Sequence, residues 1–272
     1  MSGMKDNKKL IMYLAKNDFK TRFAGSYFGV IWGFIQPLVT ILLYWFVFQL
    51  ALKAGPVANT DIPFVLWLMA GLVPWFFFSE AVINGTNCFM EYNYLVKKVM
   101  FEIKILPLVK VLSSLYVHVF FVGVLIIAYA VAGYFPGIIV IQVIYYSASM
   151  VALSLAISYL TASVAVFFKD TTQIVGIFMQ IGVWMTPIMW VFSDMIARVN
   201  NHSEMLGKVV SVILKLNPMF YIVQGYRDTM IDGVWFVQRP GMTLYFWAFV
   251  AVMLLISRKV YGKLKPHFSD VL

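Results

Sequence analysis

The chain has 272 residues, of which 62% are hydrophobic and 12% are charged. A soluble domain is about half apolar and a quarter charged, so this composition excludes an ordinary soluble protein and indicates a multi-pass membrane protein. The net charge of +9 would suggest nucleic-acid binding in a soluble protein, but here it reports membrane topology and attraction to anionic lipid.

The N-terminal segment, residues 1–28, predicts an interfacial helix. We expect no cleavable signal peptide, because residues 1–9 are polar and no short apolar run with a small-residue cleavage site follows. Within 8–25, an apolar helical face opposes a largely basic one, which is typical of a helix lying in the membrane plane. The apolar face holds Leu10, Ile11, Leu14, Ala15 and Phe19, and the basic face holds Lys9, Lys16 and Lys20.

Six stretches are long and apolar enough to span a membrane, which takes about 20 residues in a helix. They are residues 31–52, 63–83, 106–134, 138–168, 172–192 and 242–261. With both termini in the cytoplasm, fifteen of the 21 lysines and arginines lie in cytoplasmic segments and six lie outside. This asymmetry predicts six spans with the N and C termini inside. The chain is then one transmembrane domain, 1–272, with cytoplasmic segments 1–28, 91–105 and 262–272.

A polar stretch, 91–107, separates the second and third spans. Apolar residues at 92, 95, 96 and 99 recur at helical spacing, which predicts a short amphipathic helix. Such a helix either lies on the lipid headgroups or docks onto a cytosolic partner protein. The residues that we assign to docking are Tyr92, Tyr94, Leu95, Lys97, Lys98 and Phe101.

The external segment 193–241 contains two short apolar runs, 209–216 and 219–223, split by Asn217 and Pro218. Each run is too short to span. We therefore expect two re-entrant helices buried against protein, with an ordinary amphipathic external loop as the alternative.

Several function classes find no support in the sequence. Neither Gly207-Lys208 nor Gly262-Lys263 has the pattern of a phosphate-binding loop, so any ATP must be bound by another chain. His118, His202 and His267 are scattered, and we expect no metal site or catalytic triad. A secondary carrier should show paired intramembrane charges or repeated broken helices, and a glycan-modifying enzyme should show clustered acid, base or metal residues.

Two features inside the spans could carry function. Glu80 is the only carboxylate well inside a predicted span, and we weigh a role in substrate contact or gating against a solvated structural role. In the fifth span, aromatic residues accompany Gln180 and a proline kink at Pro187. Aromatic faces stack on sugar rings, so this pattern suits a passage for a long glycan, although such residues more often face lipid or pack. The aromatic residues are Phe178, Trp184 and Trp190.

An ordered series of motifs resembles the permease subunits of type-two ABC exporters for bacterial cell-surface polysaccharides: O-antigen, capsule and teichoic acid. The resemblance covers nearly the whole chain. It rests on Asp18-Phe-Lys20-Thr-Arg22, Gly29-Val-Ile-Trp32 with Pro37, Gly71-Leu-Val-Pro74-Trp75-Phe76-Phe77, Asn93-Tyr-Leu95-Val-Lys97-Lys98, Leu106-Pro107, Phe168-Lys169-Asp170, Thr186-Pro187, Asn217-Pro218 and Tyr226-Arg227. The chain departs from the family at four positions. The family often has Phe-Pro where this chain has Phe101-Glu102, Arg-Asp for Lys169-Asp170, Ser-Pro for Thr186-Pro187, and an uncharged polar residue for Glu80.

The resemblance implies a homodimer of permeases with two copies of a cytosolic ATPase subunit, which would bind ATP and magnesium. The channel would lie at the dimer interface, lined from the first and fifth spans by Trp32, Tyr44, Phe178, Gln180, Trp184 and Trp190. An outer gate would contain Asn217, Pro218, Tyr226 and Arg227, and the undecaprenyl pyrophosphate carrier would meet Lys16, Lys20 and Arg22. Anchoring to anionic lipid is an equal alternative for these three cations.

The sequence therefore predicts an all-α polytopic membrane protein of the bacterial cytoplasmic membrane. It has six spans, an interfacial N-terminal helix, a cytosolic coupling helix and two external re-entrant helices. The predicted function is the channel-forming subunit of an exporter of lipid-linked polysaccharide. A permease for a lipid or small amphiphile is the alternative, and a stand-alone carrier is a more distant one.

Overall fold

The computed structural model describes residues 2–53, 61–96 and 102–271, and within these residues every regular element is helical. Five helical stretches are long and apolar enough to cross a membrane: Gly29–Ala51, Phe64–Glu91, Ile103–Val131, Gly137–Ala165 and Pro240–His267. They contain α2 (Trp32–Trp45), α3 (Phe64–Glu91), α5 (Leu106–Val131), α6 (Gln142–Ala165) and α11 (Pro240–Leu264). They correspond to five of the six predicted spans.

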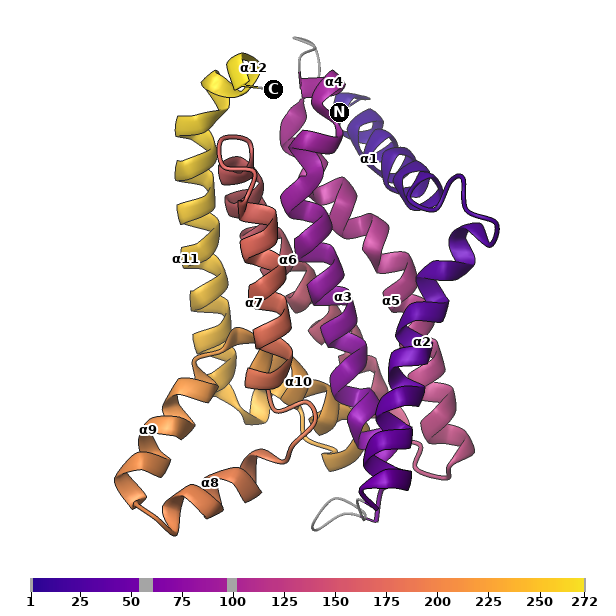
Figure 1. The fold of residues 1–272 in the computed structure, drawn as a ribbon, viewed down its shortest axis with the longest axis vertical. Coiled ribbons are helices and arrows are strands. Elements are labelled where there is room, and N and C mark those ends of the chain that lie inside the picture. The colour runs from indigo at the N-terminus through magenta and orange to yellow at the C-terminus, as the bar shows by residue number, and fades with distance from the viewer. Residues whose placement is uncertain (1, 54–60, 97–101, 272) are drawn as a thin grey trace.

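Helix α3 is the centre of the bundle, with α5 and α6 packed along it and α7, α10 and α2 also in contact (Figure 1). In its most apolar stretch 78% of the residues are buried, against 6% for Gly29–Ala51. Gly85 allows the close approach of α6, because a Cβ there would lie 2.2 Å from the Ser158 hydroxyl. Small residues let membrane helices pack backbone to backbone in this way.

The second span is longer than the predicted 63–83, because α3 continues to Glu91. Its last two turns contain polar residues that bond to neighbouring helices and do not end the helix. The Thr86 hydroxyl lies 2.7 Å from that of Thr161, and the Thr172 hydroxyl donates to Asn87 Oδ1 at 2.6 Å.

The fifth predicted span is shorter than 172–192. Helix α7 (Thr171–Met185) ends before Thr186, whose backbone is extended at φ −88° and ψ 135°. Pro187 explains this, because a residue before proline avoids the helical region. The predicted kink is therefore a helix end. At 1.5 Å per residue α7 is about 22 Å long, less than the ~30 Å hydrocarbon core.

Three helices, not two, fill most of the segment 193–241: α8 (Phe192–Asn200), α9 (Glu204–Lys215) and α10 (Pro218–Arg227), which continues as a π-helical turn to Asp232. The predicted break at Asn217 and Pro218 is confirmed, and the helices on its two sides meet at 87°. Asn217 caps α10 by accepting a hydrogen bond from the Met219 amide.

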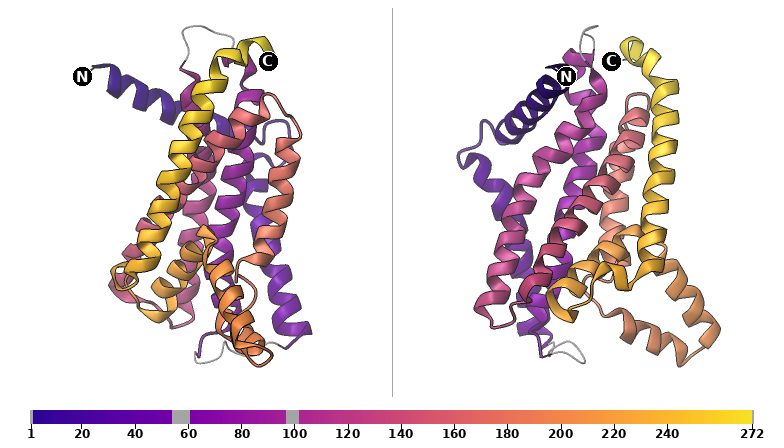
Figure 2. Two further views of the ribbon diagram at one scale, coloured as in Figure 1. Left: turned by 90° about the vertical axis from the view of Figure 1, so that its left-hand side faces the viewer. Right: turned by 180° about the vertical axis from the view of Figure 1, so that it is seen from behind.

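Different short helices lie at the two ends of the bundle. Helix α1 (Ser2–Thr21), α4 (Asn93–Val96) and α12 (Phe268–Val271) lie at one end, and α8 and α9 lie at the other (Figures 1 and 2). Helix α1 is inclined to the long helices and packs on α5, and its N-terminal part projects beyond the bundle (Figure 2). We call the first the terminal end and the second the distal end.

Candidate functional site

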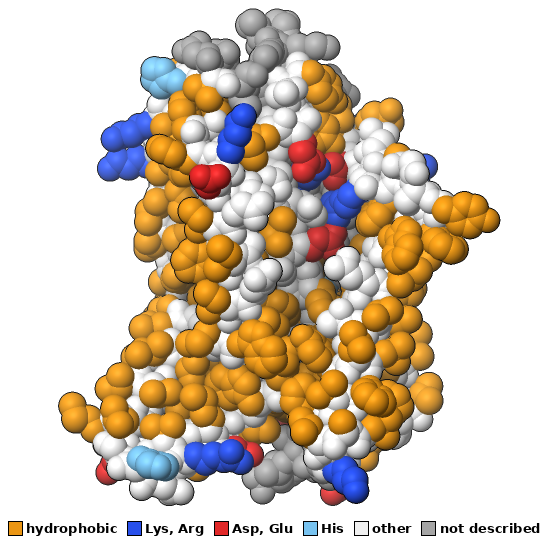
Figure 3. Space-filling model, in the orientation of Figure 1, with side chains coloured by type: hydrophobic (Ala, Val, Ile, Leu, Met, Phe, Trp, Pro, Cys, Tyr) orange, Lys and Arg blue, Asp and Glu red, His pale blue; other side chains and the backbone are white. Residues whose placement is uncertain are grey.

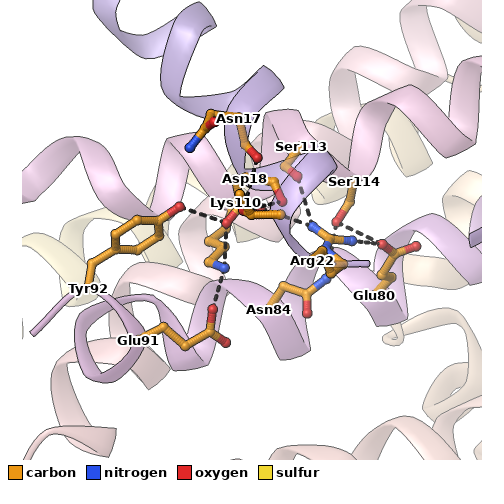
Figure 4. A network of polar contacts seen from close by, with 11 residues as sticks. Asn17, Asp18, Arg22, Glu80, Asn84, Glu91, Tyr92, Lys110, Ser113 and Ser114 are labelled. Carbon is orange, nitrogen blue, oxygen red and sulfur yellow. Dashed lines mark hydrogen bonds and ion pairs between the residues drawn. The ribbon is translucent and has the colours of Figure 1, made fainter. Parts of the chain in front are cut away.

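Five charged side chains join α1 to α3 and α5 near the terminal end, and we call them the charge network: Asp18, Arg22, Glu80, Glu91 and Lys110 (Figure 4). Ala15 and Asp18 face inward from α1, and both are buried. Lys110 is one turn into α5, and Glu80 and Glu91 lie three turns apart on α3. The network therefore fixes a helix that is inclined to the bundle to two helices that run along it.

One half of the network is built on an enclosed pair, Asp18 and Lys110, with the 49% exposed Glu91 at its edge. Lys110 Nζ lies 2.6 Å from Asp18 Oδ1 and also contacts Glu91, while the Tyr92 hydroxyl donates to Asp18 Oδ1 at 2.8 Å. The Lys110 and Asp18 side chains are 5% and 4% exposed. Burial alone would raise the pKa of Asp18, but the Lys110 charge and hydrogen bonds from Lys110, Ser113 and Tyr92 outweigh it and lower that pKa. Asp18 therefore stays ionised.

The other half is more open. Arg22 binds Glu80 through Nη1, and its Nη2 donates to Ser113 Oγ at 2.9 Å and to Asp18 Oδ2 at 3.3 Å. The Ser114 hydroxyl donates to Glu80 Oε1 at 3.3 Å. The Arg22 and Glu80 side chains are 18% and 30% exposed. Asp18 is thus shared between the enclosed and the open half.

Arg22 and Glu80 border a cavity of about 540 Å³ between α2, α3 and α7. Polar groups on all three helices line it, together with aromatic rings. The polar lining includes Gln36, Thr40, Ser79, Asn84 and Gln180, and the aromatic lining includes Phe23, Tyr44, Trp75 and Phe76. In Figure 3, charged side chains gather in the upper part of the visible face and again along its lower edge, with a broad hydrophobic surface between them. A cavity of this kind can hold a ligand with both polar and ring-shaped parts.

The residues predicted to contact glycan lie in three different places. Tyr44 and Gln180 share the cavity. Trp184 and Trp190 line a second pocket of about 430 Å³ at the distal end of α7, where the Trp190 indole donates to the Trp184 carbonyl at 3.0 Å. Trp32 and Phe178 are exposed on the outer surface of the single chain.

The three cations predicted to meet a lipid headgroup also differ from one another. Lys16 and Lys20 are exposed on α1. Arg22 is half-buried and already bonded to two carboxylates. Its carboxylate partners were not part of the predicted site. The i, i+4 spacing of Asp18 and Arg22 is a signal that sequence reasoning could have used.

The predicted docking residues lie at the terminal end as far as the structure describes them. Tyr94 is exposed, whereas Tyr92 belongs to the surroundings of the charge network. Leu95 lies in α4, and its side chain is outside the described part of the chain. Lys97, Lys98 and Phe101 lie outside the described residues, so the amphipathic helix stays a prediction.

At the distal end, the two helix breaks are bonded to each other, and we call this contact the α7–α10 junction. Arg227 donates to the carbonyls of Pro187 and Ile188 at 2.5 and 2.8 Å, and Asn217 donates to the Thr186 hydroxyl at 2.8 Å. The Arg227 guanidinium also stacks 3.4 Å from the centre of the Trp67 ring. These contacts satisfy the Pro187 and Ile188 carbonyls in the segment that follows α7.

The predicted gate residue Tyr226 is fully buried beside this junction. Its hydroxyl lies 3.0 Å from His118 Nε2 and 2.8 Å from Ser147 Oγ, so it joins α10 to α5 and α6. Tyr226 and Arg227 are buried, Asn217 and Pro218 are partly exposed, and Arg227 also lines a pocket of about 360 Å³, so the outer gate stays a prediction. Among the described residues, no group of three or more His, Cys, Asp or Glu side chains is arranged to hold a metal ion.

Residues 9–231 match the family described as ABC-2 type transporter. The chain is 24% identical to the O-antigen export system permease protein RfbA of Klebsiella pneumoniae, over 97% of this chain and 95% of that protein. It is 26% identical to the protein of the same name from Myxococcus xanthus, over 96% and 94%. It is also 23% identical to the polysialic acid transport protein KpsM of Escherichia coli, over 96% and 95%.

Proposed function

The chain belongs to the ABC-2 type transporter family, and on this premise we propose that it is the permease of an exporter of lipid-linked cell-surface polysaccharide. It is a multi-pass membrane protein whose nucleotide is bound by a partner ATPase subunit. The observation that carries the proposal is the similarity over nearly the whole chain to O-antigen export permeases and to a polysialic acid transport protein. The polar and aromatic cavity supports it, because sugars bind to surfaces of this kind.

We propose six membrane passes, with α7 as the short fifth one and both termini in the cytoplasm. Helix α7 runs from the terminal to the distal end beside α3, while α8 and α9 stay at the distal end (Figure 1). An even number of passes agrees with α1 and α12 lying at the same end. The excess of basic residues assigns that end to the cytoplasm.

We also propose a homodimer in which α2 and α7 face the second copy. In the most apolar 18-residue part of Gly29–Ala51 just 6% of the residues are buried within one chain, so most of its surface is left for lipid or protein. Trp32 and Phe178 are among the exposed side chains of these two helices. In a dimer joined there, they would line the passage together with Tyr44 and Gln180 of the cavity.

Coupling to the ATPase is assigned to the segment 91–105, which joins α3 directly to α5. Tyr94 supplies exposed apolar surface at the terminal end, and Tyr92 connects that segment to Asp18 and therefore to α1. A displacement of this segment by the ATPase would act on all three helices of the charge network.

The proposed function is tested by reconstituting the permease with its ATPase in proteoliposomes and supplying the lipid-linked polymer outside. ATP should drive the polymer into the lumen, where it becomes resistant to an added glycosidase. A complex that moves a fluorescent phospholipid but leaves the polymer accessible would instead identify an exporter of lipid or small amphiphile. Transport without the ATPase would identify a secondary carrier.

A further inference from the structure

The open half of the charge network resembles an anion-binding site that is already occupied. Arg22 presents a planar guanidinium to the end of the cavity, and the Glu80 carboxylate occupies one side of it. A guanidinium fork binds carboxylate and phosphate with similar geometry. Glu80 thus holds the position that an incoming phosphate would take.

The surroundings allow an incoming anion to replace the carboxylate bound to Arg22, but they oppose the same replacement at Lys110. Both Arg22 and Glu80 line the cavity and are partly exposed, whereas Lys110 and Asp18 are enclosed. Ser79 and Asn84 line the same wall as Glu80, so they can bond to its carboxylate after it leaves Arg22. Meanwhile, Ser113 and Asp18 keep hold of the other side of the guanidinium.

Charge sets the cost of this exchange. The network contains three carboxylates and two cations, so it has a formal charge of −1 and disfavours a further anion while Glu80 stays in place. Moving Glu80 away leaves Arg22 and Lys110 balanced by Asp18 and Glu91. An anion must therefore bind Arg22 better than a carboxylate that is already tethered beside it.

We propose that Arg22 is the anion-binding residue of the cavity, and that Glu80 is a competing carboxylate that selects a pyrophosphate headgroup over the phosphodiester of ordinary phospholipids. A pyrophosphate has more charge and more acceptor oxygens than a phosphodiester, so it can displace Glu80 where a phosphodiester cannot. The inference rests on the proposed function, since a lipid-linked polymer supplies such a headgroup. Exposed Lys16 and Lys20 would attract anionic headgroups of both kinds and so would not discriminate between them.

The test measures binding to the permease–ATPase complex in nanodiscs of zwitterionic lipid. The probes are farnesyl pyrophosphate, inorganic pyrophosphate and short-chain phosphatidylglycerol. The wild type should bind farnesyl pyrophosphate in preference to the other two. Glu80→Gln should bind farnesyl pyrophosphate roughly tenfold more tightly and should also gain binding of phosphatidylglycerol.

Two further variants make the result specific. Glu91→Gln removes the same charge from the same network but away from the cavity, so it should leave both affinities within about twofold. Arg22→Gln should abolish binding, and the double variant with Glu80→Gln should not recover it. Retained association with the ATPase and an unchanged elution volume verify that each variant is folded.

Each alternative outcome is decisive. Equal gains in Glu80→Gln and Glu91→Gln, or normal binding in Arg22→Gln, would overturn the inference while leaving the export function intact. Inorganic pyrophosphate binding as tightly as farnesyl pyrophosphate would overturn the assignment to a lipid. If Glu80→Gln gains phosphatidylglycerol binding through Arg22 while neither protein binds farnesyl pyrophosphate, the assigned substrate class and the proposed function are both wrong.

Discussion

The two ends of the bundle both use an arginine to join segments that are distant in sequence, but they use it differently. At the terminal end, Arg22 is paired with carboxylates and lines a cavity. At the α7–α10 junction, Arg227 is buried and donates to two backbone carbonyls. A carboxylate can be replaced by another anion, whereas a backbone carbonyl at a helix end cannot move away without disrupting the fold.

This difference indicates different roles. The terminal end can change partners without losing its structure, because the enclosed pair of Asp18 and Lys110 continues to hold α1. The α7–α10 junction is not divided into a fixed and an exchangeable pair of charges. The same arginine donates to the carbonyls that follow α7 and stacks on Trp67. We therefore expect ligand-dependent change at Arg22 and structural loss at Arg227.

The largest loss of stability should come from Lys110→Ala, which leaves Asp18 buried without its closest cation. Removing one partner of a buried ion pair costs about 3–5 kcal/mol. We expect a lower thermal midpoint and protease cleavage within α1. The double variant Lys110→Met with Asp18→Asn should recover much of the loss, and no recovery would show that packing, not charge, holds the helix.

Arg227→Ala should come next, because it leaves the Pro187 and Ile188 carbonyls without donors. Hydrogen bonds from charged groups contribute about 1.5–3 kcal/mol each, but the change also removes the cost of burying the guanidinium, so we expect a net loss of about 3 kcal/mol. Arg227→Lys should rescue little, because a single ammonium cannot reproduce the planar contact with Trp67 and both carbonyls. Thermal unfolding in detergent measures this, and full rescue by lysine would contradict the proposed role of the guanidinium plane.

Tyr92→Phe should have a smaller effect, since it removes just the hydrogen bond to Asp18. The expected loss is about 1 kcal/mol, with α1 more easily cleaved by protease. Tyr94→Phe is the matched control, because Tyr94 is exposed and its hydroxyl has no contact with Asp18 in the described network. Equal effects of the two changes would remove Tyr92 from the network.

The smallest effect should be that of mild acid on the docking of α1. The lowered pKa of Asp18 means that its stabilisation is complete above the ordinary aspartate value and is lost as pH falls through the folded value. Protection of α1 from protease should thus be unchanged from pH 7.5 to about pH 5 and should fall below about pH 4. A loss near pH 6 would show that another group controls the contact.

The sequence predicted the elements better than it predicted their connections. Hydrophobic length located five of the long helices, and Asn217-Pro218 marked the break between α9 and α10, because local composition decides both. The predicted ends of the helices were less accurate. Asn84 and Thr86 did not end α3, since neighbouring helices supply their partners, while Pro187 ended α7 where a kink was expected.

The charge network was missed for a physical reason. Nothing local in the sequence shows that Asp18 and Lys110, which are 92 positions apart, will meet. The same holds for Glu80 and Arg22, which are 58 positions apart. Only the packing of α1 on α5, which lies beside α3, brings them together.

The most direct test of the central claim is photo-crosslinking during export. A photoreactive amino acid at Tyr44 or Gln180 lies in the cavity, and one at Leu255 on α11 lies on the exposed outer surface as a control. In proteoliposomes stalled part-way through ATP-driven export, we predict polymer attached at Tyr44 and Gln180 and lipid attached at Leu255. Polymer attached at Leu255 and absent from both cavity positions would contradict the account.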